Sequence, residues 1–142
     1  MASDPGEVAA RTAEAMERAD AAARGAGIRL IDVGPGRART GMTVADRHVN
    51  GHGICHGGYL FLLADAALAY ASNSYGTSAV ASGADIVFLR PVAPGTELVA
   101  EAVERALSGR SGLYDVTVRA GREAVAEFRG RTRQVPGLAP PP

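Results

Sequence analysis

Lysine and tryptophan are both absent from this chain of 142 residues, and cysteine occurs only once, at Cys55. Without lysine, the protein cannot use a Schiff base, a lysine general base or a phosphate-loop lysine. A single cysteine cannot form an internal disulfide, which fits a reducing compartment. Aromatic residues make up only 5% of the chain, so a base-stacking surface for nucleic acid is not expected.

An excess of charge of one sign is also missing, because 15 basic residues balance 15 acidic ones. No global basic field is available for nucleic acid or an anionic membrane. Residues 1–25 are punctuated by charges and lack the basic start and apolar run of a secretory signal. The longest uncharged stretch lies between Arg47 and Asp65, and its apolar part is too short to span a bilayer. We therefore expect a cytoplasmic protein that binds neither nucleic acid nor membrane.

The first part of the chain predicts a helix followed by a hairpin. An Ala-rich helix over 9–23 is expected to start near Asp4-Pro5 and to stop at Gly25, covering a core without forming it. Beyond it, apolar residues alternate on both sides of Gly34-Pro35-Gly36, which predicts two strands joined by a tight turn.

The second part predicts a buried helix followed by strands. A polar, Gly-broken loop over 45–56 leads into a helix over 59–73 with apolar residues on every side, which suits a helix surrounded by protein. Period-two patterns then predict four strands, over 79–89, 97–107, 113–120 and 124–135.

These elements predict an α+β fold in which a curved antiparallel sheet wraps around one central helix, with an N-terminal helix outside it. The expected divisions are an N-terminal helical segment (1–25), a sheet-and-helix domain (26–135) and a flexible Pro-rich tail (136–142).

The loop that enters the central helix carries the most specific chemical pattern in the sequence. It reads NGHGICHGG over residues 50–58, and glycines at the start of a helix let a ligand approach unpaired backbone N–H groups. A developing oxyanion suits such a place. Eight residues after Gly57, Asp65 puts a carboxylate inside an apolar helix, where it is costly unless it has a function or a partner.

The segment NGHGICHGGYLFLLAD (50–65) resembles the signature of hotdog-fold acyl-CoA thioesterases of the phenylacetic acid degradation type. The downstream fragments NSYGTSAVASGADIVFLRP, GRSGLYDV and AEFRGRTR are similar to that family in order and spacing, so the resemblance covers roughly residues 26–134. It implies the hotdog fold and hydrolysis of aryl-acetyl-CoA thioesters, such as phenylacetyl- or hydroxyphenylacetyl-CoA. It also implies that no metal or separate cofactor takes part, and that the protein forms a homodimer or homotetramer.

The resemblance also assigns roles to individual residues. It implies that Asp65 is the catalytic base or nucleophile, that the Gly57 N–H polarises the thioester carbonyl, that Asn50 places water or substrate, and that His56 shapes the turn. For binding of substrate and coenzyme A, it implies a further set of positions: Gly58, Arg90, Pro91, Arg110, Ser111 and Gly112.

Helix geometry adds an expectation about assembly. Gly57 and Asp65 are eight residues apart, which is about 12 Å along a helix axis. Two groups that act on one carbonyl carbon must both come within roughly 3.5 Å of it. We therefore expect Gly57 of one chain to work with Asp65 of another.

Several alternatives remain open at this point. Asp65 could be structural, His48, His52 and His56 with Cys55 and Asp46 could bind zinc, and Cys55 beside His56 could be a nucleophile. A stripe formed by Arg129, Arg131 and Arg133 is expected to be a solvated strand face, with coenzyme A phosphates as the alternative. At the level of function, a hotdog hydratase or dehydratase using His56 and a non-catalytic acyl-CoA-binding protein compete with a thioesterase.

Overall fold

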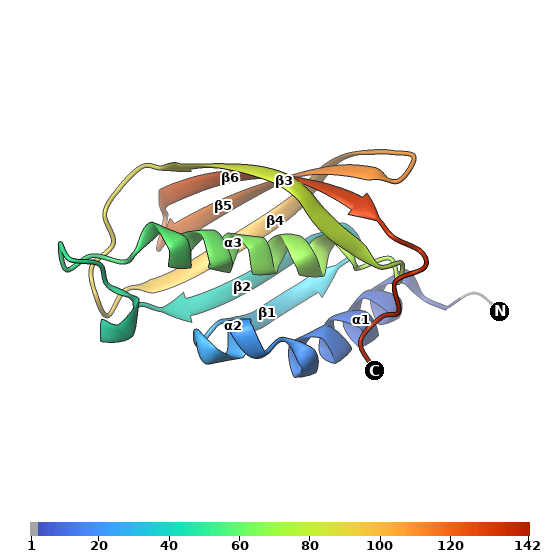
Figure 1. The fold of residues 1–142 in the computed structure, drawn as a ribbon, viewed down its shortest axis with the longest axis horizontal. Helices are drawn as coiled ribbons and strands as arrows, with labels where there is room; N and C mark the ends of the chain where they lie inside the picture. Colours follow the sequence, from blue (N-terminus) through green and yellow to red (C-terminus); the bar gives the residue numbers. More distant parts are fainter. Residues whose placement is uncertain (1–2) are drawn as a thin grey trace.

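The computed structural model describes residues 3–142. Its helices and strands, in chain order, are α1 (Pro5–Ala19), α2 (Ala21–Gly25), β1 (Arg29–Gly34), β2 (Arg37–Thr43), the 3₁₀ turn η1 (Asp46–His48), α3 (Gly57–Ser72), β3 (Ala79–Phe88), β4 (Glu97–Ser108), β5 (Ser111–Ala120) and β6 (Glu123–Gln134) (Figure 1).

The N-terminal helical segment is divided by Asp20. Asp4 caps α1 as expected, since its carboxylate accepts a hydrogen bond from the Glu7 N–H at 3.1 Å. The prediction of one helix over 9–23 is wrong at its end, because Asp20 caps α2 by accepting from the Ala23 N–H at 2.9 Å. The expected stop at Gly25 is confirmed.

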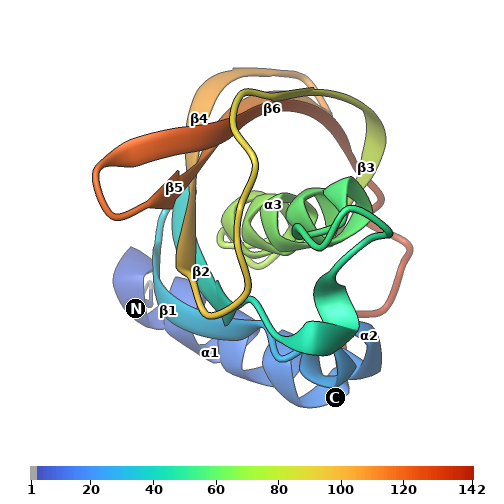
Figure 2. The same ribbon diagram turned by 90° about the vertical axis from the view of Figure 1, so that its left-hand side faces the viewer.

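One antiparallel sheet of six strands, in the order β1-β2-β4-β5-β6-β3, curls around α3 (Figure 2). The predicted hairpin and the four later strands are confirmed to within a few residues. The local sequence pattern predicts strand β3 but not its neighbour in the sheet. Strand β3 pairs with β6 and not with β4, the next strand along the chain.

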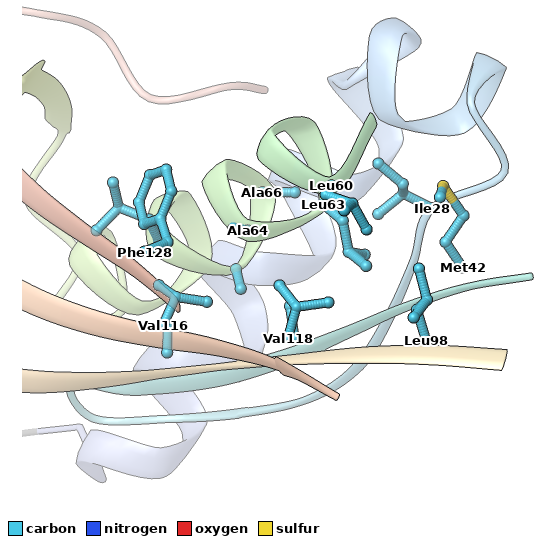
Figure 3. Packing of buried hydrophobic residues seen from close by; sticks show 14 of the residues in the cluster. Ile28, Met42, Leu60, Leu63, Ala64, Ala66, Leu98, Val116, Val118 and Phe128 are labelled. Atoms are coloured by element: carbon cyan, nitrogen blue, oxygen red, sulfur yellow. The ribbon is translucent and has the colours of Figure 1, made fainter. Parts of the chain in front are cut away.

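The core lies between the concave face of the sheet and α3. Inward-facing strand residues such as Leu98, Val116 and Val118 are fully buried and point toward Leu63 and Ala64 of the helix (Figure 3). Strand alternation places arginines on the opposite face, where Arg129 donates to Asp115 at 2.7 Å. Of the three arginines in the expected solvated face of β6, Arg129 and Arg131 are exposed and ion-paired on the outside of the sheet.

Helix α3 is only partly enclosed by this chain. The prediction of a helix surrounded by protein holds for the side that packs on the sheet, but Phe61, Asp65 and Ala69 follow one another along a less buried side. Phe61 remains 37% exposed. A helix that is apolar on every side apart from Asp65, and that leaves one side partly open, indicates that something else covers this side.

The two edges of the sheet are treated differently. Helix α1 lies against β1, and its Glu17 carboxylate accepts a hydrogen bond from the Leu30 N–H at 3.1 Å. Strand β3, at the other edge, has a strand neighbour on one side only. Strand β3 carries the exposed apolar residues Val80, Val87 and Phe88, and Leu89 directly after it is also exposed. An open apolar edge strand is a site for pairing with another chain.

None of the helices formed by residues 3–142 has the length and apolar character needed to cross a membrane.

Candidate active site

The N-terminus of α3 leaves one backbone N–H free for a ligand. His56 is the N-cap, and its Nδ1 accepts a hydrogen bond from the Gly58 N–H at 3.1 Å. Within residues 3–142, no atom accepts a hydrogen bond from the Gly57 N–H. The helix dipole adds partial positive charge at the same place. The prediction that His56 shapes this turn is consistent with its capping role, and Gly57 is left as the free donor.

The loop before the helix is fixed by Asn50 and by links to its neighbours. The Asn50 Oδ1 accepts from the His52 N–H at 2.9 Å, and the Asn50 N–H donates to the Ile54 carbonyl at 2.8 Å. The Cys55 N–H donates to the Val92 carbonyl at 2.8 Å, which ties this loop to the segment that follows β3. The Asn50 side chain therefore orders the loop through its oxygen, and its Nδ2 finds no acceptor in the described part of the chain.

His48 anchors the same loop from below. Its Nδ1 accepts from the Ala45 N–H at 2.9 Å, its Nε2 lies 2.8 Å from the Ala26 carbonyl oxygen, and its backbone carbonyl accepts from the His56 N–H at 2.7 Å. With both ring nitrogens engaged and the side chain buried, His48 is a structural residue that holds the helix entrance in place.

A cavity of about 420 Å³, the entrance cavity, opens beside Gly57. Its walls come from the loop, the start of α3 and the end of β3, and they include four of the predicted site residues: Asn50, Gly57, Arg90 and Pro91. Arg90 is already engaged, because its guanidinium donates to the Ala124 carbonyl and lies 3.4 Å from the Glu123 carboxylate. Arg90 thus braces the β5–β6 turn against this wall.

Phe88 lies directly against Gly57. A Cβ atom added at Gly57 would lie 2.8 Å from the Phe88 ring, so only glycine fits there without moving the ring. The ring is 51% exposed and lines the entrance cavity. An aromatic wall beside the free N–H lowers the local dielectric, which strengthens any hydrogen bond made to a developing charge.

Asp65 lies in a different cavity, of about 360 Å³, which we call the carboxylate cavity. No donor within residues 3–142 forms a hydrogen bond or an ion pair with its carboxylate. Burial raises the pKa of Asp65 above the usual value, and the negative charge of Asp20 raises it further. A partly buried carboxylate without a partner suits a base or nucleophile better than a structural anchor.

The predicted site residues therefore fall into three groups in a single chain, at the start of α3, at Asp65 and around Arg110. Asn50, His56, Gly57, Gly58 and the Arg90-Pro91 pair gather at the start of α3, whereas Asp65 lies further along in its own cavity. Because α3 runs without a break over Gly57–Ser72, the spacing of about 12 Å expected between Gly57 and Asp65 holds. Gly58 is close to the entrance, but its N–H is taken by His56.

The predicted residues Arg110, Ser111 and Gly112 lie at the opposite end of the molecule. Arg110 lies in the turn between β4 and β5, drawn in orange in Figure 1, and Ser111 and Gly112 begin β5, beyond the C-terminal end of α3. A Cβ at Gly112 would lie 2.5 Å from the Thr132 Oγ1 and 2.9 Å from the Tyr114 ring, so packing alone explains that glycine. Within one chain these residues are not brought to Gly57.

The alternative chemistries are less consistent with these contacts. Burial raises the pKa of the Cys55 thiol, which disfavours the thiolate that a nucleophile needs. The ring nitrogens of His48 hold the loop, and His56 caps the helix. In the described part of the chain, no three His, Cys, Asp or Glu side chains group as metal ligands.

Sequence reasoning missed several residues of both cavities. Phe88 carries a signal that could have been used, because it ends an apolar strand at a sheet edge and immediately precedes Leu89-Arg90-Pro91. Met16 and the tail residue Leu138 also line the carboxylate cavity, but their arrival there depends on the path of the chain in three dimensions. Nothing in their local sequence marks them.

The sequence and fold of this chain are similar to those of known proteins of one class. The profile of the thioesterase superfamily matches residues 52–127, a range that includes both Gly57 and Asp65. The chain belongs to the thioesterase superfamily, and its helix wrapped in a curled sheet is the hotdog fold of that class.

The particular relatives are bacterial and archaeal. The chain is 45% identical over 128 residues to the acyl-coenzyme A thioesterase PaaI of Escherichia coli, covering 89% of this chain and 91% of that protein. The structure of the E. coli PaaI protein from the phenylacetic acid degradation operon matches with a TM-score of 0.90, covering 93% of this chain and 96% of that one. A putative esterase of Archaeoglobus fulgidus is 35% identical, covering 80% of this chain and 74% of that protein.

Proposed function

We propose that this protein is an acyl-CoA thioesterase that hydrolyses aryl-acetyl-CoA substrates of the phenylacetyl or hydroxyphenylacetyl type. The observation that carries the proposal is the free Gly57 N–H at the start of α3, beside a capped Gly58 and at the edge of a cavity. The aryl-acetyl preference is supported by the similarity to PaaI and by the apolar walls of both cavities.

In the proposed reaction, the thioester carbonyl oxygen accepts a hydrogen bond from the Gly57 N–H. As negative charge develops on that oxygen, the helix dipole and the N–H stabilise it. The carbonyl carbon is then open to attack, the C–S bond breaks, and coenzyme A leaves as the thiol while the acyl group leaves as a carboxylic acid.

Asp65 supplies the attack in one of two ways. As a base, it takes a proton from a water molecule that adds to the carbonyl carbon, and that proton passes to the departing thiolate. As a nucleophile, it adds to the carbonyl carbon itself, and water then hydrolyses the acyl–Asp65 anhydride to release the carboxylic acid and restore the carboxylate. Burial raises the pKa of Asp65, which makes its carboxylate a stronger base than that of an exposed aspartate. The capping role of His56 favours hydrolysis over the hydratase alternative, because its Nδ1 already accepts from the helix.

Two copies of the chain form each site in this proposal. The support is the distance of about 12 Å between Gly57 and Asp65 on one helix, together with their separate cavities. The open edge of β3 and the partly exposed stripe of α3 carry exposed apolar residues, among them Phe61, Val87 and Phe88, that a second copy would cover. A dimer is the minimum assembly, and a homotetramer follows from the family resemblance.

The proposed reaction needs no group beyond the protein, the substrate and water. We infer that no metal or separate cofactor is needed, that coenzyme A enters only as part of the substrate, and that the enzyme works in the cytoplasm. The donor chemistry supports the first point, since a backbone N–H and a carboxylate together suffice for thioester hydrolysis.

A thiol-release assay tests the proposal directly. The purified protein is incubated with phenylacetyl-, 4-hydroxyphenylacetyl-, acetyl- and long-chain acyl-CoA, with and without a chelator. We expect the aryl-acetyl thioesters to give the highest kcat/KM, with no loss on chelation. Absence of thiol release from every thioester, or activity that vanishes with the chelator and returns with zinc, would contradict it.

A further inference from the structure

The C-terminal tail, residues 136–142, runs from the end of β6 past the start of β3 toward α1 (Figure 1). Its side chains are not simply directed into solvent, because Leu138, Ala139 and Pro141 line the carboxylate cavity. The tail therefore lines the same cavity as Asp65, although Leu138 comes 73 positions after Asp65 in the sequence.

The other walls of that cavity come from well-packed elements. Leu68 and Ala69 of α3 form one side, Val80 and Ala81 of β3 form another, and Met16 of α1 closes a third. Leu68 is fully buried in the core, so the wall on that side cannot yield easily. The tail is the part of the lining that belongs to no helix or strand.

The polar groups of the cavity indicate what it can hold. Asn73 is fully engaged, since its Nδ2 donates to the Ala69 and Ala79 carbonyls and its Oδ1 accepts from the Ala79 N–H. The Ser72 hydroxyl donates to the Ala69 carbonyl. Beside these, Asp65 has a carboxylate without a hydrogen-bonding partner in the described chain. The cavity therefore suits an apolar group that is bonded to the carbon on which Asp65 acts. The acyl chain of a thioester is such a group, because it is bonded to the carbonyl carbon.

The tail is held in place weakly. The Val135 N–H donates to the Ser78 carbonyl at 2.8 Å, just before the tail begins. Beyond it, the described residues give one hydrogen bond, from the Leu138 N–H to the Val135 carbonyl at 2.9 Å, and this bond lies within the same turn. The prolines at 136 and 140–142 cannot donate at all. Side-chain packing alone therefore keeps the tail against the cavity.

We infer that the tail is the outer wall of the acyl subsite and that it limits the size of the acyl group that can reach Asp65. This inference rests on the proposed thioesterase function. It assigns a specificity-determining role to Leu138, which touches the cavity while remaining 49% exposed and therefore has room to move.

Two variants test the inference, a Leu138→Ala protein and a chain that ends at Val135. For each, kcat/KM is measured with phenylacetyl-CoA and with bulkier thioesters, such as 4-phenylphenylacetyl-CoA and dodecanoyl-CoA. We expect the ratio of bulky to phenylacetyl substrate to rise by roughly tenfold in the shortened chain and by less in Leu138→Ala. Ile31→Ala is the matched control, because Ile31 is an exposed aliphatic residue, at 39%, on β1.

A binding measurement separates this inference from the proposed function. The same comparison is made in an Asp65→Asn background by titration calorimetry, with the intact and the shortened chain and the same acyl-CoA series. A shift of the Kd ratio toward bulky acyl groups supports the tail as the wall, even if the wild-type protein hydrolyses no thioester. Equal ratios for intact, shortened and Leu138→Ala chains, all folded by circular dichroism, would overturn it, whatever the turnover of the wild type.

Discussion

Asp65 has two properties that seldom occur together at a structural position. Its carboxylate is partly buried, and no described residue donates a hydrogen bond to it. Burial raises its pKa in the folded state, so the ionised form is less stable in the fold than in water. A carboxyl with a raised folded pKa favours folding most below its unfolded pKa, and that contribution is lost as pH rises through the folded pKa. At neutral pH, Asp65 should therefore decrease the free energy of unfolding.

Replacing Asp65 with asparagine should separate activity from stability. We expect Asp65→Asn to lose roughly 10²- to 10⁴-fold in kcat because the amide is neither a base nor a nucleophile. Its melting temperature at pH 7 should stay equal to or exceed that of the wild type, since a costly charge is removed. Thiol release and differential scanning calorimetry on one preparation measure both quantities.

The matched control is Asp85→Asn, because Asp85 is an exposed aspartate paired with Arg131 on the outside of the sheet. It should leave turnover within about twofold of the wild type, since exposed ion pairs contribute little. A lower melting temperature for Asp65→Asn with turnover intact would instead identify Asp65 as a structural residue.

The negative charge of Asp20 should affect the pKa of Asp65. Its carboxylate raises the pKa of Asp65, so Asp20→Asn should lower that pKa and move the acidic limb of the kcat/KM profile to lower pH. Asparagine is also a good N-cap, so the hydrogen bond to the Ala23 N–H and the melting temperature should be retained.

The pH profile is compared with that of Asp4→Asn, which changes the cap of α1 in the same way. Asp4 is absent from the charges that raise the pKa of Asp65. A limb that stays in place in Asp20→Asn, or that moves equally in both variants, would show that Asp20 does not act on Asp65.

At the scale of elements, the contact between α3 and β6 depends on a missing side chain. A Cβ at Gly130 would lie 2.6 Å from Leu68 Cδ2, and Leu68 is buried and cannot swing away. Strand β6 can therefore approach the helix closely only with glycine at this position.

Gly130→Ala should destabilise the protein by about 1–3 kcal/mol, the usual cost of overfilling a packed core. Urea denaturation followed by circular dichroism measures the change. Gly25→Ala is the control, because nothing lies within 4 Å of a Cβ there and alanine is the better helix former. Equal stability of the two variants would mean that Leu68 repacks without cost.

The elements themselves could be predicted well from sequence, because their signals are local. Alternation in β4, for example, places Leu98, Ala100 and Ala102 on the buried face as expected. The break at Asp20 was missed because good helix formers on both sides hide a cap whose effect depends on the turn. The pairing of β3 with β6 is a contact between distant segments, and no local pattern encodes it.

The candidate site divides in the same way. The sequence points to Gly57 through the glycines at the start of a helix and to Asp65 through a charge inside an apolar helix, and their catalytic roles stay predictions. The capping bond of His56 and the engagement of Arg90 with the β5–β6 turn depend on side-chain conformation in the folded chain. Both contacts join segments far apart in the sequence or depend on rotamers, as does the contact of Phe88 with Gly57, so no local pattern encodes them.

At the scale of the whole molecule, a site shared between two copies predicts complementation. Asp65→Ala and Gly57→Pro should each be inactive, the second because proline lacks the N–H. In a mixed dimer, one composite site has both groups intact and the other has neither, so mixing should recover up to half of the wild-type activity per mixed dimer. Thiol release after subunit exchange, with the mixed dimer quantified by native mass spectrometry, is the measurement.

Gly57→Ala is needed beside Gly57→Pro, because any Cβ at this position displaces the Phe88 ring. Alanine keeps the N–H, so it separates loss of the donor from movement of the ring. Proline suits the first position of a helix, and His56 already has the extended backbone required before it. Mixed dimers that form in good yield and remain inactive would exclude a shared site.

The pairing of β3 with β6 also determines when, during synthesis, the sheet can be completed. During synthesis β3 leaves the ribosome before β4, β5 and β6. Phe88 therefore cannot pair with Ala126 until the ribosome has added the residues between them. At ordinary rates of translation that wait lasts a few seconds. Throughout it, the apolar edge that a second copy would cover has no strand on either side. The nascent chain can complete its sheet, and only then present a single correct edge for self-association, once its last strand has emerged.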